Sequence, residues 1–134
     1  MLATPKHGWS QITIGDWTDR CSYLNDVPTL LLEALELTCR THRPAAVAFD
    51  AEGWEYTIVF DDFATHIISD KCDEGYIYSS VEVKSTDLAK ELVADIRHDI
   101  DGWADWAFNP SDDEVDERKK DLLVFCDILE KRIK

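Results

Sequence analysis

The sequence predicts an α+β fold: an antiparallel sheet of four to five strands, with one helix after the first strand and two C-terminal helices packed on the sheet. Apolar residues alternate with a period of two between residues 45 and 84, and they recur at helical spacing on both sides of that segment. No Pro/Gly/Ser-rich linker divides the 134 residues, of which 45% are apolar. Residues 1–134 are therefore predicted to form a single domain.

The first two elements are predicted to be a strand and a helix. Apolar and polar residues alternate over residues 9–14, which predicts a strand. A helix is predicted over roughly 27–41, because Asn25-Asp26 offers N-cap chemistry and Pro28 suits a first helical turn. Pro44 should end it.

The segment from about 45 to 84 is predicted to be an antiparallel meander. Its alternating runs are AAVAFD, then Trp54, Tyr56, Ile58 and Phe60, then ATHIIS, then Ile77, Ser79, Val81 and Val83. Short turns at 52–53, 61–62 and 73–75 separate these runs. This gives four strands, to which residues 9–14 would add a fifth.

Two helices are predicted to follow the meander. The first covers about 86–107, with an apolar line of Leu88, Leu92, Ile96, Ile100 and Trp103. The second opens with the capping-box pattern Ser111-Asp-Asp-Glu114. It also contains Glu114 with Arg118 and Asp116 with Lys120, which are favourable pairs at i,i+4.

The cysteine pattern and the hydropathy favour a reduced, cytoplasmic protein. Cys21, Cys39, Cys72 and Cys126 form no C-x-x-C pair and no zinc-binding spacing, so we expect scattered free thiols. The N-terminal residues have no apolar signal region, and no apolar run approaches the length that spans a membrane.

The net charge of −14 is concentrated in two short stretches. Residues 50–74 carry eight acidic residues and one basic residue, and residues 95–117 carry nine acidic residues and one basic residue. Such a surface repels nucleic acid and anionic membranes, so neither is expected as a partner. A cationic protein is the partner class that this charge favours.

The familiar catalytic motifs are missing from the sequence. It has no G-x-S-x-G, H-E-x-x-H, P-loop or dinucleotide fingerprint. Residues 99–110 resemble a calcium loop, but its twelfth position is Pro110 instead of the required Glu. Asp95 and His98 lie three apart on a predicted helix without an obvious third metal ligand, and Cys21 has no partner histidine. We therefore expect no enzyme activity, metal or cofactor.

The acidic hairpin is the best candidate for catalytic carboxylates. Asp50 and Glu52 flank its turn, and Asp61-Asp62 end the following strand. A strand between them would hold Asp50 and Asp61 on the order of 20 Å apart at ~3.3 Å per residue, which is too far for a glycosidase pair. We instead interpret Asp50, Glu52, Glu55, Asp61 and Asp62 as docking charges, with Trp54 and Tyr56 holding the hairpin to the core.

A second set of docking candidates lies on the predicted helix 86–107. Asp87, Glu91, Asp95 and Asp99 recur at every fourth residue, and such like-charge pairs cost roughly 0.2–0.5 kcal/mol each. An exposed Trp106 rimmed by Asp99, Asp101 and Asp105 would make an aromatic anchor for a partner. The candidates on this helix are therefore Glu91, Asp95, Asp99, Asp101, Asp105 and Trp106; chance and solubility are the alternative explanation of the acidic stripe.

The arrangement of GWSQITIG, SYLNDVPTLLLEAL, AFDAEGWEYTIVF and DIDGWADWAF resembles the small acidic immunity proteins of bacterial contact-dependent inhibition and polymorphic toxin systems. The resemblance covers about residues 8–108. It implies a cytosolic inhibitor that binds the C-terminal toxin domain of a cognate effector, often a nuclease, and covers its active site. Two alternatives stay open: a small acidic secretion chaperone, and a small hydrolase that uses Asp50, Glu52 or Asp62.

Overall fold

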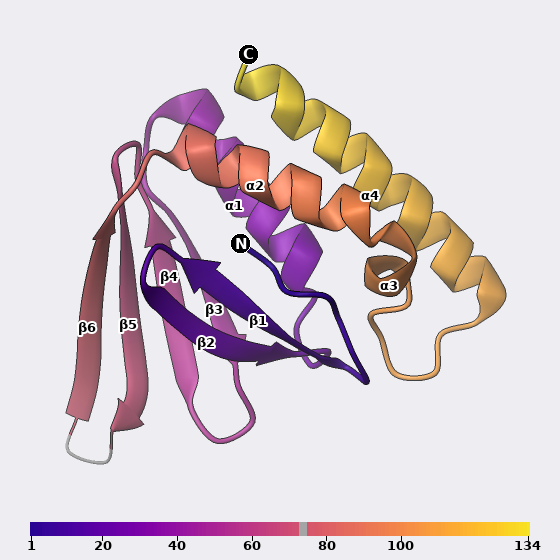
Figure 1. Ribbon diagram of the computed structural model, residues 1–134, viewed down its shortest axis with the longest axis horizontal. Coiled ribbons are helices and arrows are strands. Elements are labelled where there is room, and N and C mark those ends of the chain that lie inside the picture. Colours follow the sequence, from indigo (N-terminus) through magenta and orange to yellow (C-terminus); the bar gives the residue numbers. More distant parts are fainter. Residues whose placement is uncertain (73–74) are drawn as a thin grey trace.

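The computed structural model describes residues 1–72 and 75–134 (Figure 1). Its elements in order are β1 (Trp9–Ile14), β2 (Trp17–Ser22), α1 (Val27–Thr41), β3 (Ala45–Asp50), β4 (Glu55–Phe60), β5 (Ala64–Cys72), β6 (Gly75–Glu82), α2 (Ser85–His98), α3 (Ile100–Ala104) and α4 (Asp112–Arg132). The predicted α+β class is confirmed. The turn expected at residues 73–75 lies partly outside the described residues.

Strands β3 to β6 form the predicted meander, an antiparallel sheet in the order β3-β4-β5-β6. In its register Val47 lies opposite Ile58, and Ile58 lies opposite Ile67. These three side chains are buried on one face, as the period-two pattern predicts. Trp54 lies in the turn before β4, and Tyr56 is only 1% exposed.

The predicted first strand exists, but it does not extend the main sheet. β1 pairs with β2 through a two-residue turn, Gly15-Asp16, and the two form a separate two-stranded sheet. Gly15 has φ +59, which glycine adopts without strain, and this permits the tight hairpin. The main sheet therefore has four strands, and α1 follows a second strand that the sequence did not indicate.

The helices pack beside one another, and β5 and β6 are the strands that lie farthest from α4 (Figure 1). α1 contacts β3 and β4, whereas α2 packs mainly on α1 and α4, and α4 packs on α1, α2 and α3. Arg97 of α2 joins α4 through Asp127 at 2.7 Å and Glu130 at 2.6 Å. The Arg97 hydrogen bond lowers the pKa of the Glu130 carboxyl.

The helix predicted over 86–107 is interrupted at Asp99. This residue has φ −131 and ψ 49, outside the helical region, and it separates α2 from the short α3. The change of direction lets Trp103 continue the core, where it is 1% exposed. The predicted N-cap of α4 is confirmed, because the Ser111 hydroxyl accepts the Glu114 amide at 3.2 Å.

Across residues 1–72 and 75–134, the structure contains no helix with the combination of length and hydropathy needed to cross a membrane.

Candidate protein-binding surfaces

The acidic turn between β3 and β4 is held in place by an arginine from β2. The turn closes with the Ala51 amide on the Trp54 carbonyl at 2.8 Å, and Glu52 adopts φ 59. Arg20 donates from Nε to the Ala51 carbonyl at 2.8 Å and from Nη2 to the Glu52 carbonyl at 2.9 Å. Asp50 and Glu52 remain exposed. The turn therefore presents its carboxylates to solvent while its backbone is fastened to the β1–β2 hairpin.

Trp54 contributes to the same attachment. Its ring lies under the Arg20 guanidinium at 4.2 Å, and its indole nitrogen donates to Asp19 at 3.0 Å. Lys71 also lies over this ring, with Nζ 4.5 Å from the centroid. The Tyr56 hydroxyl donates to the Arg20 carbonyl at 2.8 Å. Trp54 and Tyr56 thus hold the hairpin to the rest of the molecule, as interpreted from the sequence.

The hairpin carboxylates do not converge. Asp50 ends β3 and pairs with Glu55 at the start of β4, whereas Asp61 and Asp62 follow the far end of β4. At that end Asp62 approaches the His42 ring at 3.2 Å. This arrangement agrees with the separation of Asp50 from Asp61 deduced from strand geometry, because the length of β4 lies between them.

Asn25 connects the two acidic stretches of the sequence. Its side-chain oxygen accepts the Asp50 amide at 2.8 Å, and its carbonyl accepts the Trp106 indole N–H at 2.8 Å. Asn25 thus joins the β2–α1 loop (23–26) to the β3–β4 turn (51–54) and to the α3–α4 loop (105–111), and these segments lie along the lower side of the molecule in Figure 1. We call these three segments, with the flanking Asp50 and Glu55, the loop end.

Trp106 is part of the core, so the prediction that it is an exposed anchor is wrong. It is 4% exposed and packs on Trp103 with ring centroids 5.0 Å apart. Its indole N–H, the only polar group of the side chain, donates a hydrogen bond to the Asn25 carbonyl. The nearby Asp105 is exposed at the end of α3, whereas Phe108, at 75% exposed, is the aromatic side chain that this segment offers to solvent.

The remaining helix candidates are dispersed. Glu91 is exposed on α2, but Asp95 accepts the Met1 amine at 2.8 Å and the Leu2 amide at 2.9 Å. Asp101 pairs with Lys119 at 2.8 Å. The expected stripe of uncompensated carboxylates is therefore broken: Asp95 has a cationic partner, and Asp99 does not lie on the same helix as the other three.

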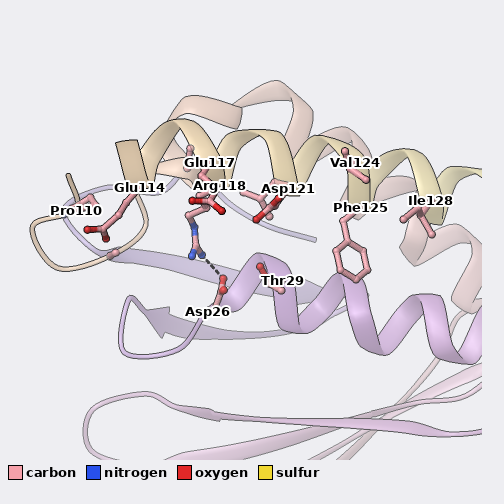
Figure 2. Close-up of a pocket in the computed structure, with 13 residues that line it drawn as sticks. Asp26, Thr29, Pro110, Glu114, Glu117, Arg118, Asp121, Val124, Phe125 and Ile128 are labelled. Carbon is pink, nitrogen blue, oxygen red and sulfur yellow. Dashed lines mark hydrogen bonds and ion pairs between the residues drawn. The ribbon is translucent and has the colours of Figure 1, made fainter. Parts of the chain in front are cut away.

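A groove of about 660 Å³ runs between α4 and the start of α1 (Figure 2). Its lining residues are Asp26, Thr29, Ala104, Ala107, Pro110, Glu114, Glu117, Arg118, Asp121, Leu122, Val124, Phe125 and Ile128. Arg118 reaches across it to Asp26 and also donates to the Trp103 carbonyl at 3.2 Å (Figure 2). The predicted pairing of Arg118 with Glu114 is replaced by this contact between elements. The groove begins at the loop end, to which Asp26 and Pro110 belong.

The sheet face opposite α1 carries exposed aromatic residues that sequence analysis did not single out. Tyr76 is 80% exposed and Tyr78 is 61% exposed, and Ile68 lies beside Tyr78 in the register. The Tyr78 hydroxyl and His66 Nδ1 are 2.6 Å apart. The sequence GYIYSS could have indicated these exposed aromatic residues, because large apolar side chains occur there on both faces of a period-two strand.

Three of the four cysteines are buried free thiols, and the side chain of Cys72 lies outside the described residues. Burial raises the pKa of Cys21 from 9.0 to about 12 and that of Cys126 from 9.0 to about 11, and it also raises the pKa of Cys39. At neutral pH these groups are protonated and shielded, so they are poor nucleophiles.

We expect a Cys72→Ser variant to react with an aromatic disulfide reagent at pH 8 only after unfolding. Above pH 9 the free energy of unfolding should fall. Thiols in the unfolded chain ionise there, whereas burial raises the pKa of native Cys21 to about 12 and keeps it protonated. Absorbance of the released thiolate, with and without denaturant, measures the first effect. Rapid modification of native protein would show that a thiol is accessible after all.

Residues 1–72 and 75–134 contain no group of three or more His, Cys, Asp or Glu side chains suitably arranged for a metal ion. Comparison of the chain with protein-family models, curated proteins and solved structures gave no match.

Proposed function

We propose that this chain is an immunity protein that binds and neutralises a cognate bacterial toxin domain of the nuclease class. The observation that carries the proposal is the loop end, where Asp50, Glu52, Glu55 and Asp105 come from both acidic stretches of the sequence. The similarity of layout to bacterial immunity proteins, noted above, supplies the class of partner.

Two arginines beside the loop end are engaged in holding the fold. Arg20 hydrogen-bonds two turn carbonyls, and Arg118 bonds Asp26 and the Trp103 carbonyl. Their positive charge reduces the local field but is not free to meet a partner's carboxylates. The exposed carboxylates Asp50, Glu52, Glu55 and Asp105 are therefore not neutralised by these two arginines.

An acidic end of this kind suits a nuclease partner. A nuclease binds a polyphosphate chain and is expected to carry a basic substrate groove, which carboxylates can occupy in place of phosphates. Opposite potentials can raise association rates toward roughly 10⁸–10⁹ M⁻¹s⁻¹ at low salt, against about 10⁵–10⁶ for neutral partners. Fast capture would prevent cleavage before the complex forms, and no turnover by the inhibitor is needed.

The proposal predicts that a toxin domain is encoded beside this chain, and binding to that domain tests it. We expect a stoichiometric complex whose association rate falls as salt rises. The double variant Asp50→Asn/Glu55→Gln should associate about tenfold more slowly at low ionic strength, because two carboxylates at the docking end are neutralised. Stopped-flow fluorescence over a salt series measures these rates.

The matched control is Asp16→Asn/Glu33→Gln, which removes the same charge from the β1–β2 turn and from α1. This variant should associate within about twofold of the parent protein, because charges outside the docking surface stay farther from the partner and are more strongly screened by salt. Equal slowing by the two variants would show that net charge, not the loop end, directs binding. No complex with the neighbouring toxin would contradict the immunity function. A dimer by light scattering would then favour the secretion chaperone.

A further inference from the structure

The groove along α4 has a charged half and an apolar half. Beginning at the loop end, α4 contributes Glu114, Glu117 and Asp121, and further along it contributes Phe125 and Ile128 (Figure 2). The positions 117, 121, 125 and 128 recur at intervals of three or four residues, so they follow one face of the helix. A ligand lying along this face would meet carboxylates first and apolar side chains second.

Three of the four groove carboxylates have no ion-pair partner among the described residues. Asp26 is paired with Arg118, and Glu114 contacts the Ser111 hydroxyl at 3.1 Å. Within the described parts of the chain, Glu117 and Asp121 have no ion-pair partner. They lie one turn apart and repel each other, so a cation placed between them would relieve that repulsion.

The apolar half is open to solvent. Ile128 is 39% exposed, and Phe125 is half-buried against the core. Figure 2 shows the Phe125 ring pointing from α4 toward α1. Covering such side chains removes apolar area from water at about 25 cal/mol per Å².

We propose that this groove receives a cationic amphipathic helix of the partner. The inference rests on the proposed function and adds where the partner docks: lysine or arginine side chains meet Glu117 and Asp121, and leucine-like side chains cover Phe125 and Ile128. From Glu117 to Ile128, α4 spans about 17 Å at 1.5 Å per residue, which matches a ligand helix of about three turns. Charge complementarity favours this occupant, and the groove is continuous with the loop end through Asp26.

The test uses a designed peptide of about twelve residues, with lysines in its first half and leucines in its second half on one helical face. Binding is measured by fluorescence anisotropy at physiological salt, beside a scrambled peptide of the same composition. The groove variant is Glu117→Gln/Ile128→Ser. Its matched control, Asp116→Asn/Leu123→Ser, also removes one carboxylate and one exposed apolar side chain from α4, at positions outside the groove.

The ordered peptide should bind more tightly than the scrambled one. The groove variant should lose about tenfold in affinity, because it removes one charge contact and one apolar contact. The control should lose less than about twofold. Equal losses in the two variants, or equal binding of the two peptides, would overturn the inference.

The same variants are then tested for binding to the neighbouring toxin domain. A complex that is unchanged by the groove variant but weakened by Asp50→Asn/Glu55→Gln would refute the groove and retain the proposed function. Lack of any toxin complex would refute the proposed function, while the peptide measurement still decides whether the groove binds a cationic helix.

Discussion

Replacing Trp106 with alanine is expected to lower the free energy of unfolding by about 3–5 kcal/mol, the range found for buried aromatic residues. The substitution removes a ring that is 4% exposed and packed at 5.0 Å on Trp103. It also leaves the Asn25 carbonyl without the indole donor. Urea unfolding followed by circular dichroism measures the loss.

The conservative variant Trp106→Phe separates packing from hydrogen bonding. It keeps most of the ring but no donor, so it should cost about 1–3 kcal/mol, the penalty for an unsatisfied acceptor together with a small cavity. If Trp106 were instead a surface anchor for the toxin, alanine would leave stability within about 0.5 kcal/mol and act only on binding. A stability loss below 1 kcal/mol for Trp106→Ala would contradict its place in the core.

The two readings of Trp106 show which features a sequence pattern can resolve. The meander from 45 to 84 was predicted because its alternation records burial directly, as at Val47, Ile58 and Ile67. A tryptophan surrounded by aspartates occurs both in turns that pack on a core and at exposed binding surfaces. The local sequence alone does not distinguish these two cases. Trp106 is held in the core by a hydrogen bond to the Asn25 carbonyl, which lies 81 residues away along the chain.

Other differences also arise from contacts between distant segments. β2 escaped prediction because only Cys21 and Ser22 of its six residues are buried, so its alternation is weak. The break at Asp99 is not marked by proline, and the apolar line from Leu88 to Trp103 runs through it. The sequence pattern therefore predicts the class of the fold and the acidic stretches. It could not find the loop end or the groove along α4, which depend on tertiary packing.

Replacing Arg20 with methionine should lower the free energy of unfolding by about 2–4 kcal/mol. Two hydrogen bonds from a charged group to the Ala51 and Glu52 carbonyls are lost, together with the cation–π contact to Trp54 at 4.2 Å. Methionine retains an apolar stem of similar length, so the loss reports on the guanidinium and not on a cavity. Denaturant unfolding measures the stability. Hydrogen exchange at the Ala51 amide, which closes the turn, measures the local effect.

Lys71→Met is the matched control, because it removes a second cation from the same Trp54 ring without touching the turn carbonyls. If Arg20 clamps the hairpin, the control should cost less than about 1 kcal/mol and leave exchange at Ala51 unchanged. Equal effects from the two variants would mean that both residues act through charge alone. The distinction bears on binding: in the clamp account, Arg20 fixes the direction of Asp50 and Glu52, so its loss weakens the toxin complex even though it makes the loop end more negative.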